Sequence, residues 1–351
     1  MKKAAFLKAV TAAALVLGQL AAVPLARAQA PGKPAELIPV NIGLPISNYW
    51  PAYIARDLKL FEQAGLAPKF FMFQSGAPLI AGMKSGSLDV AWTGLATLFM
   101  LGQGIPLKFV LVPLDSSSQM GLVVDPKSGI NSWKDIARSK NIGAPTATCA
   151  EVSMVMAARA AGTSRANLKA SNLAPNLIQT ALQSGQIDST FMWGPWNLVY
   201  RDAGYKIVSW DKDFMKDGGV CATTVAVRPD FLKTNPSVGC RMVKVHAMAL
   251  AAAKRDPEHA IRTMQEAFNI PYKIAKETYE TLIIPSIESQ LQPDTPWTLS
   301  NKSAGLTEKL FTAGEALLEA KAISQRIPRA TIAEAVDDSH IRKYLQSNDC
   351  N

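Results

Sequence analysis

LIQTALQSGQIDSTFMWG, residues 177–194, has a close counterpart earlier in the chain, LIAGMKSGSLDVAWTG, residues 79–94. Both stretches begin with apolar residues at helical spacing and continue with Ser-Gly, one polar residue, an aliphatic residue and Asp. Each then ends in a short strand pattern and a glycine. Two copies so far apart are too few for a solenoid, so the sequence predicts two similar lobes, each with one such helix–strand unit.

The glycines of these two stretches have different expected roles. Gly86 and Gly185 directly follow the helical patterns, where a left-handed residue often ends a helix. Gly94 and Gly194 follow the strand patterns. Ligands of open parallel sheets bind outside the carboxyl ends of the strands, so we expect these two glycines to face one crevice between the lobes.

Strand and helix patterns alternate over most of the chain. Strands are expected at 40–44, 69–73, 88–92 and 107–112, then at 121–124, 141–145, 168–173, 187–193, 205–210 and 221–227. The chain after Pro236 reads as helical. The alternation predicts parallel pairing with right-handed crossovers. The predicted boundaries are 32–122 with 222–351 for the first lobe and 123–221 for the second, joined by two crossing strands.

The first 28 residues predict a secretory signal peptide. Lys2, Lys3 and Lys8 precede an apolar run from Ala9 to Leu25, and Ala26-Arg27-Ala28 is an A-x-A cleavage site. We therefore expect cleavage after Ala28 and an exported protein. No cysteine follows the apolar run, so no lipid anchor is expected, and no later stretch has 18 consecutive apolar residues.

Charge and cysteine content narrow the function. Removing the leader, which has four basic residues and no acids, lowers the net charge from +9 to +5. That mild excess suits small anions, and no basic stripe points to nucleic acid. The four cysteines include no C-x-x-C and have no histidine nearby, so we expect no zinc site. No other metal cluster and no phosphate-binding glycine loop is visible, so we expect no metal and no cofactor. Four cysteines allow three disulfide pairings, and our first expectation is a bridge from Cys240 to Cys350 at the tail.

The order of these features resembles bacterial periplasmic solute-binding proteins. The likeness rests on the signal peptide, the repeated Ser-Gly-x-aliphatic-Asp phrase, SWKDI at 132–136 before a strand ending in Pro145, and MWGPW at 192–196. These receptors serve ABC importers for nitrate, alkanesulfonates, taurine and related small organics. The resemblance implies a type II periplasmic-binding fold of two α/β lobes, two hinge strands and a helical C-terminal region. It also implies a monomer that binds a small molecule and docks on an ABC permease.

The resemblance also implies a set of ligand contacts. In the first lobe they are Ser47, Asn48, Tyr49 and Trp50, the loop Gln74, Ser75, Gly76 and Ala77, and the strand end Thr93 and Gly94. In the second lobe they are the loop and helix start Thr146, Ala147, Thr148, Cys149, Ala150 and Glu151, with Trp193 and Gly194. Taurine-type members typically have an acid at the position that matches Gly194, which would pair with the ammonium group.

Residues 147–162 open a helix, and two readings of its start remain open. The amides of Thr148 to Glu151 could bind an anion, because the first amides of a helix have no partner inside it. Alternatively, Thr148 and Glu151 form a capping box, and Glu151 acts as a cap more readily than as a ligand contact. Cys149 could be a nucleophile, but a disulfide or an inert thiol fits an exported chain better.

Five aromatic residues lie at expected strand ends and loops. We assign Tyr49 and Trp193 to the cleft wall, where aromatic surface holds organic ligands, and Trp92 and Trp196 to the core. Trp50 fits either place.

Three functions are compatible with the sequence. The first is a receptor that closes on a solute and delivers it to a permease. The second is an enzyme of the thiamine-pyrimidine synthase type on the same fold, whose chemistry uses an active-site histidine. All three histidines here lie in the C-terminal third, at His246, His259 and His340. We therefore expect no enzyme and no catalytic residue. The third is an exported sensory module, which neighbouring permease genes would distinguish from an importer.

Overall fold

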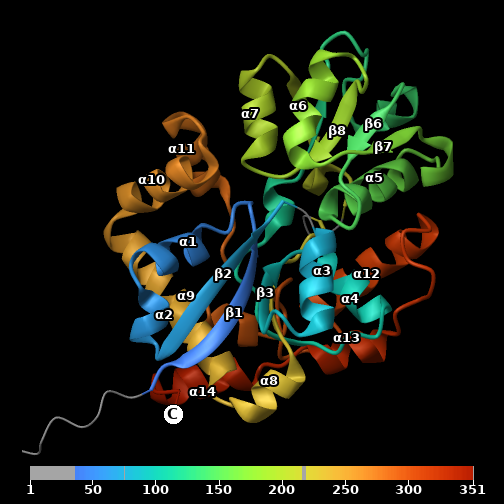
Figure 1. The fold of residues 1–351 in the computed structure, drawn as a ribbon. Coiled ribbons are helices and arrows are strands. Elements are labelled where there is room, and N and C mark those ends of the chain that lie inside the picture. Colours follow the sequence, from blue (N-terminus) through green and yellow to red (C-terminus); the bar gives the residue numbers. More distant parts are fainter. Residues whose placement is uncertain (1–35, 75, 216–218, 351) are drawn as a thin grey trace, which may run out of the picture. The chain divides into compact units, whose positions relative to one another are not determined.

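A computed structural model describes residues 36–74, 76–215 and 219–350. They form two five-stranded sheets, each packed with helices, as Figure 1 shows. The first sheet contains β1 (Ile38–Pro45), β2 (Leu66–Phe73), β3 (Val90–Thr93), β4 (Lys108–Leu111) and β10 (Thr224–Val227). The second contains β5 (Gly121–Val124), β6 (Ile142–Ala144), β7 (Ala170–Asn172), β8 (Ser189–Met192) and β9 (Lys206–Trp210). The expected leader, its cleavage site and Ser75 lie outside the described residues.

The two sheets have the same strand order. The first runs β2-β1-β3-β10-β4 and the second β7-β6-β8-β5-β9. β3 and β8, the strands of the two repeated stretches, therefore occupy the same central position. The expected architecture of two α/β lobes is confirmed, and the repeat marks equivalent places in them.

The expectation of parallel pairing is wrong for one strand in each sheet. β1 pairs in parallel with β2 and β3, and β6 does so with β7 and β8. However, β10 is antiparallel to β3 and β4, and β5 is antiparallel to β8 and β9. Both strands arrive from the other sheet. Each enters its new sheet at the edge where the carboxyl ends of the neighbouring strands lie. It therefore runs antiparallel to those strands.

The helices follow the expected pattern, with several additional short ones. Before β10 they are α1 (Trp50–Asp57), α2 (Leu60–Gln63), α3 (Gly76–Ser85), α4 (Ala96–Gly102), α5 (Cys149–Ala160), α6 (Pro175–Gln183) and α7 (Trp196–Asp202). The SWKDI segment forms the 3₁₀ helix η2 (Trp133–Arg138), and η3 (Arg165–Asn167) and η4 (Asp211–Asp213) are also 3₁₀. After β10 come α8 (Pro229–Thr234), α9 (Val238–Arg255), α10 (Pro257–Phe268), α11 (Tyr272–Thr281), η6 (Glu288–Leu291), α12 (Gly305–Glu319), α13 (Arg329–Ala335) and α14 (Ser339–Ser347).

The repeated Ser-Gly-x-aliphatic-Asp phrase has a structural role in both lobes. Gly86 and Gly185 have φ of 76° and 70°, which confirms the left-handed ends of α3 and α6. The Asp89 carboxylate then accepts the amide of Asn41, within β1, at 2.9 Å. In the second lobe Asp188 accepts the amide of Lys140 at 2.9 Å, beside β6. The two aspartates therefore fasten the neighbouring strand at the amino end of β3 and β8.

Two segments connect the sheets. The first contains the 3₁₀ helix η1 (Ser116–Gln119) and leads from β4 to β5, and the second returns through residues 219–223 to β10. They touch each other where Asp115 and Ala222 form an antiparallel bridge. Leu114 also donates its amide to the Thr223 hydroxyl at 3.3 Å. We call these two segments the hinge; the residue boundaries of the lobes remain a prediction.

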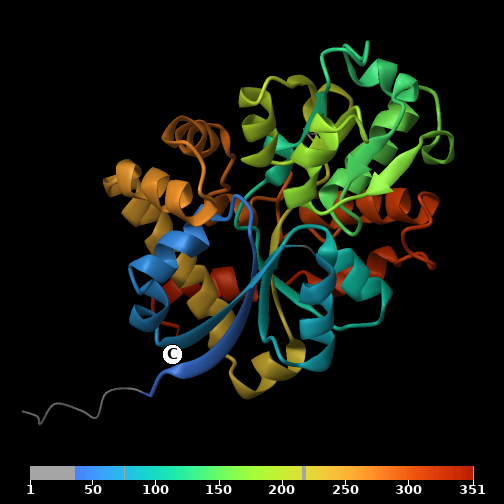
Figure 2. The same ribbon diagram turned by 45° about the horizontal axis from the view of Figure 1, so that its top comes forward.

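The C-terminal helices pack mostly on the first lobe, as both views of the ribbon indicate (Figures 1 and 2). α9 contacts α1 and β4, and α14 contacts α9. The structure joins Cys240 of α9 to Cys350 through a disulfide, which holds the tail against this helix. Among the described residues, no helix combines the length and the apolar character that crossing a membrane requires.

Candidate functional site

A small cavity lies at the carboxyl ends of strands from both sheets. Its lining includes Pro45 and Thr93, the last residues of β1 and β3. It also includes Trp193, next to the end of β8, and Thr148, at the start of α5. The cavity measures about 60 Å³. Its position is the one at which open α/β sheets bind ligands.

Ten of the residues expected to contact ligand line this cavity. They are Ser47, Tyr49, Gln74, Gly76, Thr93, Gly94, Ala147, Thr148, Cys149 and Trp193. They come from both lobes, so the structure brings together side chains up to 146 positions apart in the sequence. Their contact with ligand remains a prediction.

Other expected contacts lie elsewhere. The Asn48 amide donates to Gln119 Oε1 at 2.8 Å and is fully buried. Trp50 packs on Tyr279 with ring centroids 5.2 Å apart. Gly194 faces Gln119, since a Cβ there would lie 2.5 Å from Gln119 Oε1. Each of these positions is therefore occupied by contacts within the protein, and Thr146, Ala150 and Glu151 are likewise absent from the described cavity wall.

Gln119 of the hinge organises several of these contacts. Its side chain accepts from Asn48 and donates to the Thr278 carbonyl at 2.8 Å. Its backbone carbonyl accepts from the Asn197 side chain at 2.8 Å. The chain Asn48–Gln119–Asn197 thus ties the loop after β1 to the hinge and to α7. No sequence motif indicated this hydrogen-bond network, because its three residues are far apart in the chain.

The start of α5 is capped and still borders the cavity. Thr148 Oγ1 accepts the amide of Ala150 at 3.3 Å and donates to the Pro145 carbonyl at 2.6 Å. Glu151 accepts the amide of Ala147 at 3.2 Å, and burial raises the pKa of its carboxyl group. Thr148 and Glu151 therefore satisfy local backbone groups, close to the capping reading of the sequence. The positive end of the helix dipole remains directed at the cavity.

Two aromatic side chains with polar groups, Tyr49 and Trp193, line the cavity. The Tyr49 side chain is 3% exposed, and burial raises the pKa of its phenol, so it is neutral. The indole Nε1 of Trp193 is buried and has no hydrogen-bond partner among the described residues. Burying an unpaired N–H is costly, so a ligand acceptor at this point would stabilise it. Trp92 is fully buried, and Trp196 packs on Phe268.

The described cavity wall has no acidic or basic side chain. Among the described lining residues, only Tyr49 and the disulfide-bonded Cys149 and Cys221 are of a titratable type. An anion would therefore be held by neutral donors and the helix end, and an ammonium group would find no carboxylate in the described lining.

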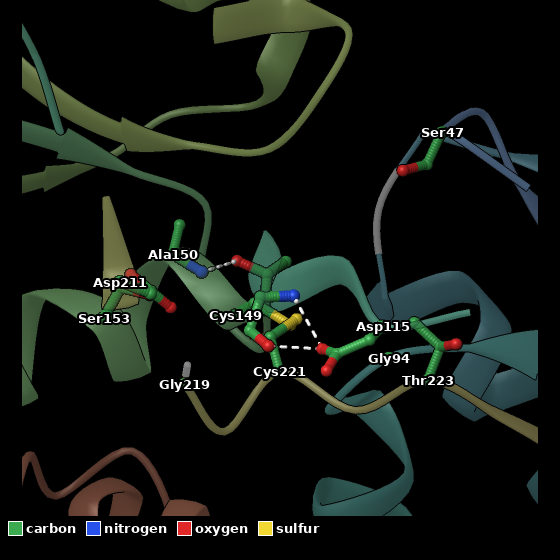
Figure 3. The surroundings of a disulfide bond; sticks show 12 residues. Ser47, Gly94, Asp115, Cys149, Ala150, Ser153, Asp211, Gly219, Cys221 and Thr223 are labelled. Atoms are coloured by element: carbon green, nitrogen blue, oxygen red, sulfur yellow. Dashed lines mark hydrogen bonds between the residues drawn. A yellow bond between two sulfur atoms is a disulfide. The ribbon is translucent and has the colours of Figure 1, made fainter. Parts of the chain in front are cut away.

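The lining also contains residues that the sequence did not single out as contacts. Ile46, Leu79, Leu95 and Ala96 add apolar surface from the first lobe, and Ser116 and Cys221 come from the hinge. Cys221 forms a disulfide with Cys149, which excludes a free thiol nucleophile at the start of α5 (Figure 3). Leu79 is the first residue of the repeated stretch, and this position is the sequence feature that could have indicated it as a lining residue.

A larger groove of about 1080 Å³ lies elsewhere on the hinge. It is lined by η1, the ends of α7 and α11, the loop before Trp297 and the start of α12. Strand ends contribute little to it, so we place the candidate site in the smaller cavity. None of the three histidines lines either space, and no group of metal-ligating side chains was found in the described part of the chain.

Residues 33–266, about two thirds of the chain, match the model of the NMT1-like family. The chain belongs to this family. The NMT1-like protein is 26% identical to a putative binding protein of Brucella abortus (strain 2308), over 65% of this chain and 70% of that one. It is 26% identical to the taurine-binding periplasmic protein of Escherichia coli K12, over 54% and 58%, respectively. It is 24% identical to a putative aliphatic sulfonates-binding protein of Bacillus subtilis 168, over 70% and 75%.

Its fold is similar to that of a solved binding protein. The alkanesulfonate-binding protein SsuA of Xanthomonas axonopodis pv. citri, bound to MOPS, superimposes with a TM-score of 0.70. The match covers 86% of this chain and 99% of that one at 17% sequence identity. The NMT1-like protein therefore has the periplasmic-binding-protein fold, as the sequence predicted.

Proposed function

We propose that this NMT1-like protein is a periplasmic receptor that binds a small anion between its lobes and delivers it to an ABC permease. The observation that carries the proposal is the cavity at the strand ends of both sheets, next to the start of α5. Because both lobes contribute contacts, a ligand there would favour the closed state. The names of the taurine- and sulfonate-binding relatives agree with this class of ligand.

The charge of the lining refines the ligand class. Neutral donors and a helix start suit a sulfonate, a carboxylate or nitrate. An ammonium group would lose its hydration without gaining a carboxylate partner. We therefore propose an anion without an ammonium group. A single water needs about 10–15 Å³ of such space, so a cavity of about 60 Å³ suits a solute with a handful of non-hydrogen atoms.

A matched pair of ligands tests the proposal. Ethanesulfonate and taurine share the two-carbon sulfonate and differ by the ammonium group. The protein is unfolded and refolded without reductant, which removes bound ligand and keeps the disulfides, and titrated with both by calorimetry. Ethanesulfonate should bind at least about tenfold more tightly, or about 1.4 kcal/mol. Tighter binding of taurine would contradict the ligand class. A thermal-shift screen that includes nitrate, carboxylates, amines and pyrimidines covers the alternatives.

The periplasmic location has its own test. We propose export with cleavage after Ala28, so that the mature chain begins at Gln29. N-terminal sequencing of material from the periplasm should read Gln29 first. Retention of Met1 or a lipid-modified first residue would contradict export of this kind.

Catalysis has little support in this cavity. The pyrimidine-synthase chemistry uses an active-site histidine, and the described lining has none. The relatives named above are binding proteins. We therefore propose binding without a chemical step, and the ligand should be recovered unchanged from the refolded, reloaded protein by mass spectrometry.

A further inference from the structure

The Cys149–Cys221 disulfide lies in the wall of the candidate site. Cys149 is the first residue of α5, which belongs to the second lobe. Cys221 lies in the returning hinge segment, three residues before β10 of the first sheet. Both residues line the cavity, and they are only 6% and 2% exposed. The bond therefore forms a covalent link between the start of α5 and the hinge segment that leads into the first sheet, at the point where the ligand would bind.

The Cys221 end of the bond is fixed to the first lobe. The adjacent Ala222 bridges to Asp115, and the next residue, Thr223, is bonded to Leu114. The chain then continues into β10, which pairs with both β3 and β4. Movement of Cys221 relative to the first sheet is therefore restricted.

The Cys149 end is fixed to the second lobe. Thr148 caps α5 and donates to the Pro145 carbonyl at the end of β6. One turn into the helix, Ser153 donates to Asp211 Oδ2 at 2.9 Å, beside the end of β9, and Figure 3 shows this pair close to the disulfide. The start of α5 therefore moves with the second sheet.

Gly94 completes this arrangement at the end of β3. A Cβ at Gly94 would lie 3.3 Å from Cys149 Sγ and 3.9 Å from Cys221 Sγ. The first of these distances is tight, and Gly94 has no left-handed φ that would itself require glycine. The disulfide thus packs directly on the backbone of the first lobe (Figure 3).

We propose that Cys149 and Cys221 are positioning residues for the ligand site. Their bond holds the amides at the start of α5 at a fixed distance from Gly94, so that the donors of both lobes are arranged before the anion arrives. Donors held in place bind more tightly than mobile ones, because less freedom is lost on binding. This inference rests on the proposed function, since it assigns the bond a role in anion affinity.

The second disulfide provides a matched control. Cys240 and Cys350 are 110 positions apart and Cys149 and Cys221 are 72 apart, so the two bonds restrict the unfolded chain to a similar degree. Cys240 and Cys350 do not line the cavity. A general loss of stability would therefore follow from either deletion, whereas a loss of affinity should follow from only one.

The binding test uses Cys221→Ser, the double variant Cys149→Ser/Cys221→Ser and the control Cys240→Ser/Cys350→Ser. Each is refolded without ligand and titrated with ethanesulfonate by calorimetry. The first two should raise Kd about tenfold, the effect of weakening about one charge-assisted hydrogen bond. The control should stay within about twofold. Unchanged affinity in Cys221→Ser, or an equal loss in the control, would overturn the proposal.

A second measurement separates this inference from the proposed function. If the wild-type protein binds no ethanesulfonate, the proposed ligand class fails. Hydrogen exchange of the ligand-free protein then tests whether the disulfide holds the start of α5 in place. The amides of α5 should exchange faster in Cys221→Ser than in the wild type, and not in the control. Equal exchange in all three proteins would overturn the positioning role.

Reduction gives an independent check in the Cys240→Ser/Cys350→Ser background, where the Cys149–Cys221 bond is the one disulfide left. Dithiothreitol transfers two electrons and two protons to it and becomes a cyclic disulfide itself. The reduced protein should reproduce the exchange rates and the weaker binding of Cys221→Ser. Reduction to two thiols without either effect would count against the proposal.

Discussion

Trp193 follows β8 and presents an indole N–H that has no partner in the described structure. Trp193→Phe keeps most of the aromatic surface and removes this donor. We expect it to weaken ethanesulfonate binding about threefold to tenfold, since a neutral hydrogen bond contributes about 0.5–1.5 kcal/mol. Calorimetry measures the affinity, and thermal unfolding of the ligand-free variant should show a melting temperature close to that of the wild type.

Trp193→Ala removes both the donor and the ring. It should weaken binding more than Trp193→Phe, by at least about tenfold. Trp193 also packs against core residues, so Trp193→Ala will lower stability as well. Trp196→Ala is the matched control, because this ring packs on Phe268 and does not line the cavity. Wild-type affinity in Trp193→Ala would place the ligand elsewhere.

His246 gives a pH-dependent prediction outside the site. It is fully buried in α9 with its ring 6.0 Å from that of Trp92, and burial lowers its pKa to about 3. In the unfolded chain the pKa is about 6.5, so the unfolded state binds a proton that the native state does not. The native state therefore loses stability as the pH falls below about 6.5, by about 2 kcal/mol at pH 5.

His246→Leu should remove this contribution. Urea unfolding of the wild type and the variant at pH 7.5 and pH 5 measures it. The wild type should lose about 2 kcal/mol more than the variant between the two pH values. Parallel losses in the two proteins would show that His246 is protonated in the native state.

At the scale of elements, Asp188 holds the start of β6 against β8. Its carboxylate accepts the Lys140 amide and the Ser139 hydroxyl, at 2.9 Å and 2.5 Å. Asp188→Asn replaces these charge-assisted bonds with weaker ones and should cost about 1.5–3 kcal/mol. The site lies at the other end of β8, so the affinity for ethanesulfonate should not change. Denaturant unfolding and calorimetry on the same samples test both parts.

β8 and its counterpart β3 illustrate how much of the fold and of the candidate site could be predicted from the sequence. The repeated phrase placed two equivalent helix–strand units, because helix stops and strand lengths are local properties. The direction of β5 and β10 was predicted wrongly, because it depends on which lobe each strand comes from. Local patterns also placed Tyr49 in the loop after β1 and Trp193 at the end of β8. They could not show that Asn48 would be bound by Gln119, or that Cys149 would pair with Cys221, since both partners are distant in sequence.

At the scale of the whole molecule, the Cys240–Cys350 bond closes a loop of 110 positions around the C-terminal helices. Cys240→Ser/Cys350→Ser should lower the free energy of unfolding by about 2–4 kcal/mol, chiefly by releasing the unfolded chain. Thermal and urea unfolding under non-reducing conditions measure the loss. Wild-type stability of the double variant would show that the tail contributes nothing through this bond.

The position of β10 in the first sheet determines which lobe can fold first when the chain is synthesised from its amino terminus. β10 lies between β3 and β4, so those two strands have no direct pairing in this sheet. The first lobe therefore stays incomplete until residues 224–227 appear, after every strand of the second sheet. Such late, distant pairing is slow. β1, β2 and β3 can pair with one another before that, but among the described strands β4 pairs only with β10 and must wait for it, so the second lobe is free to assemble first.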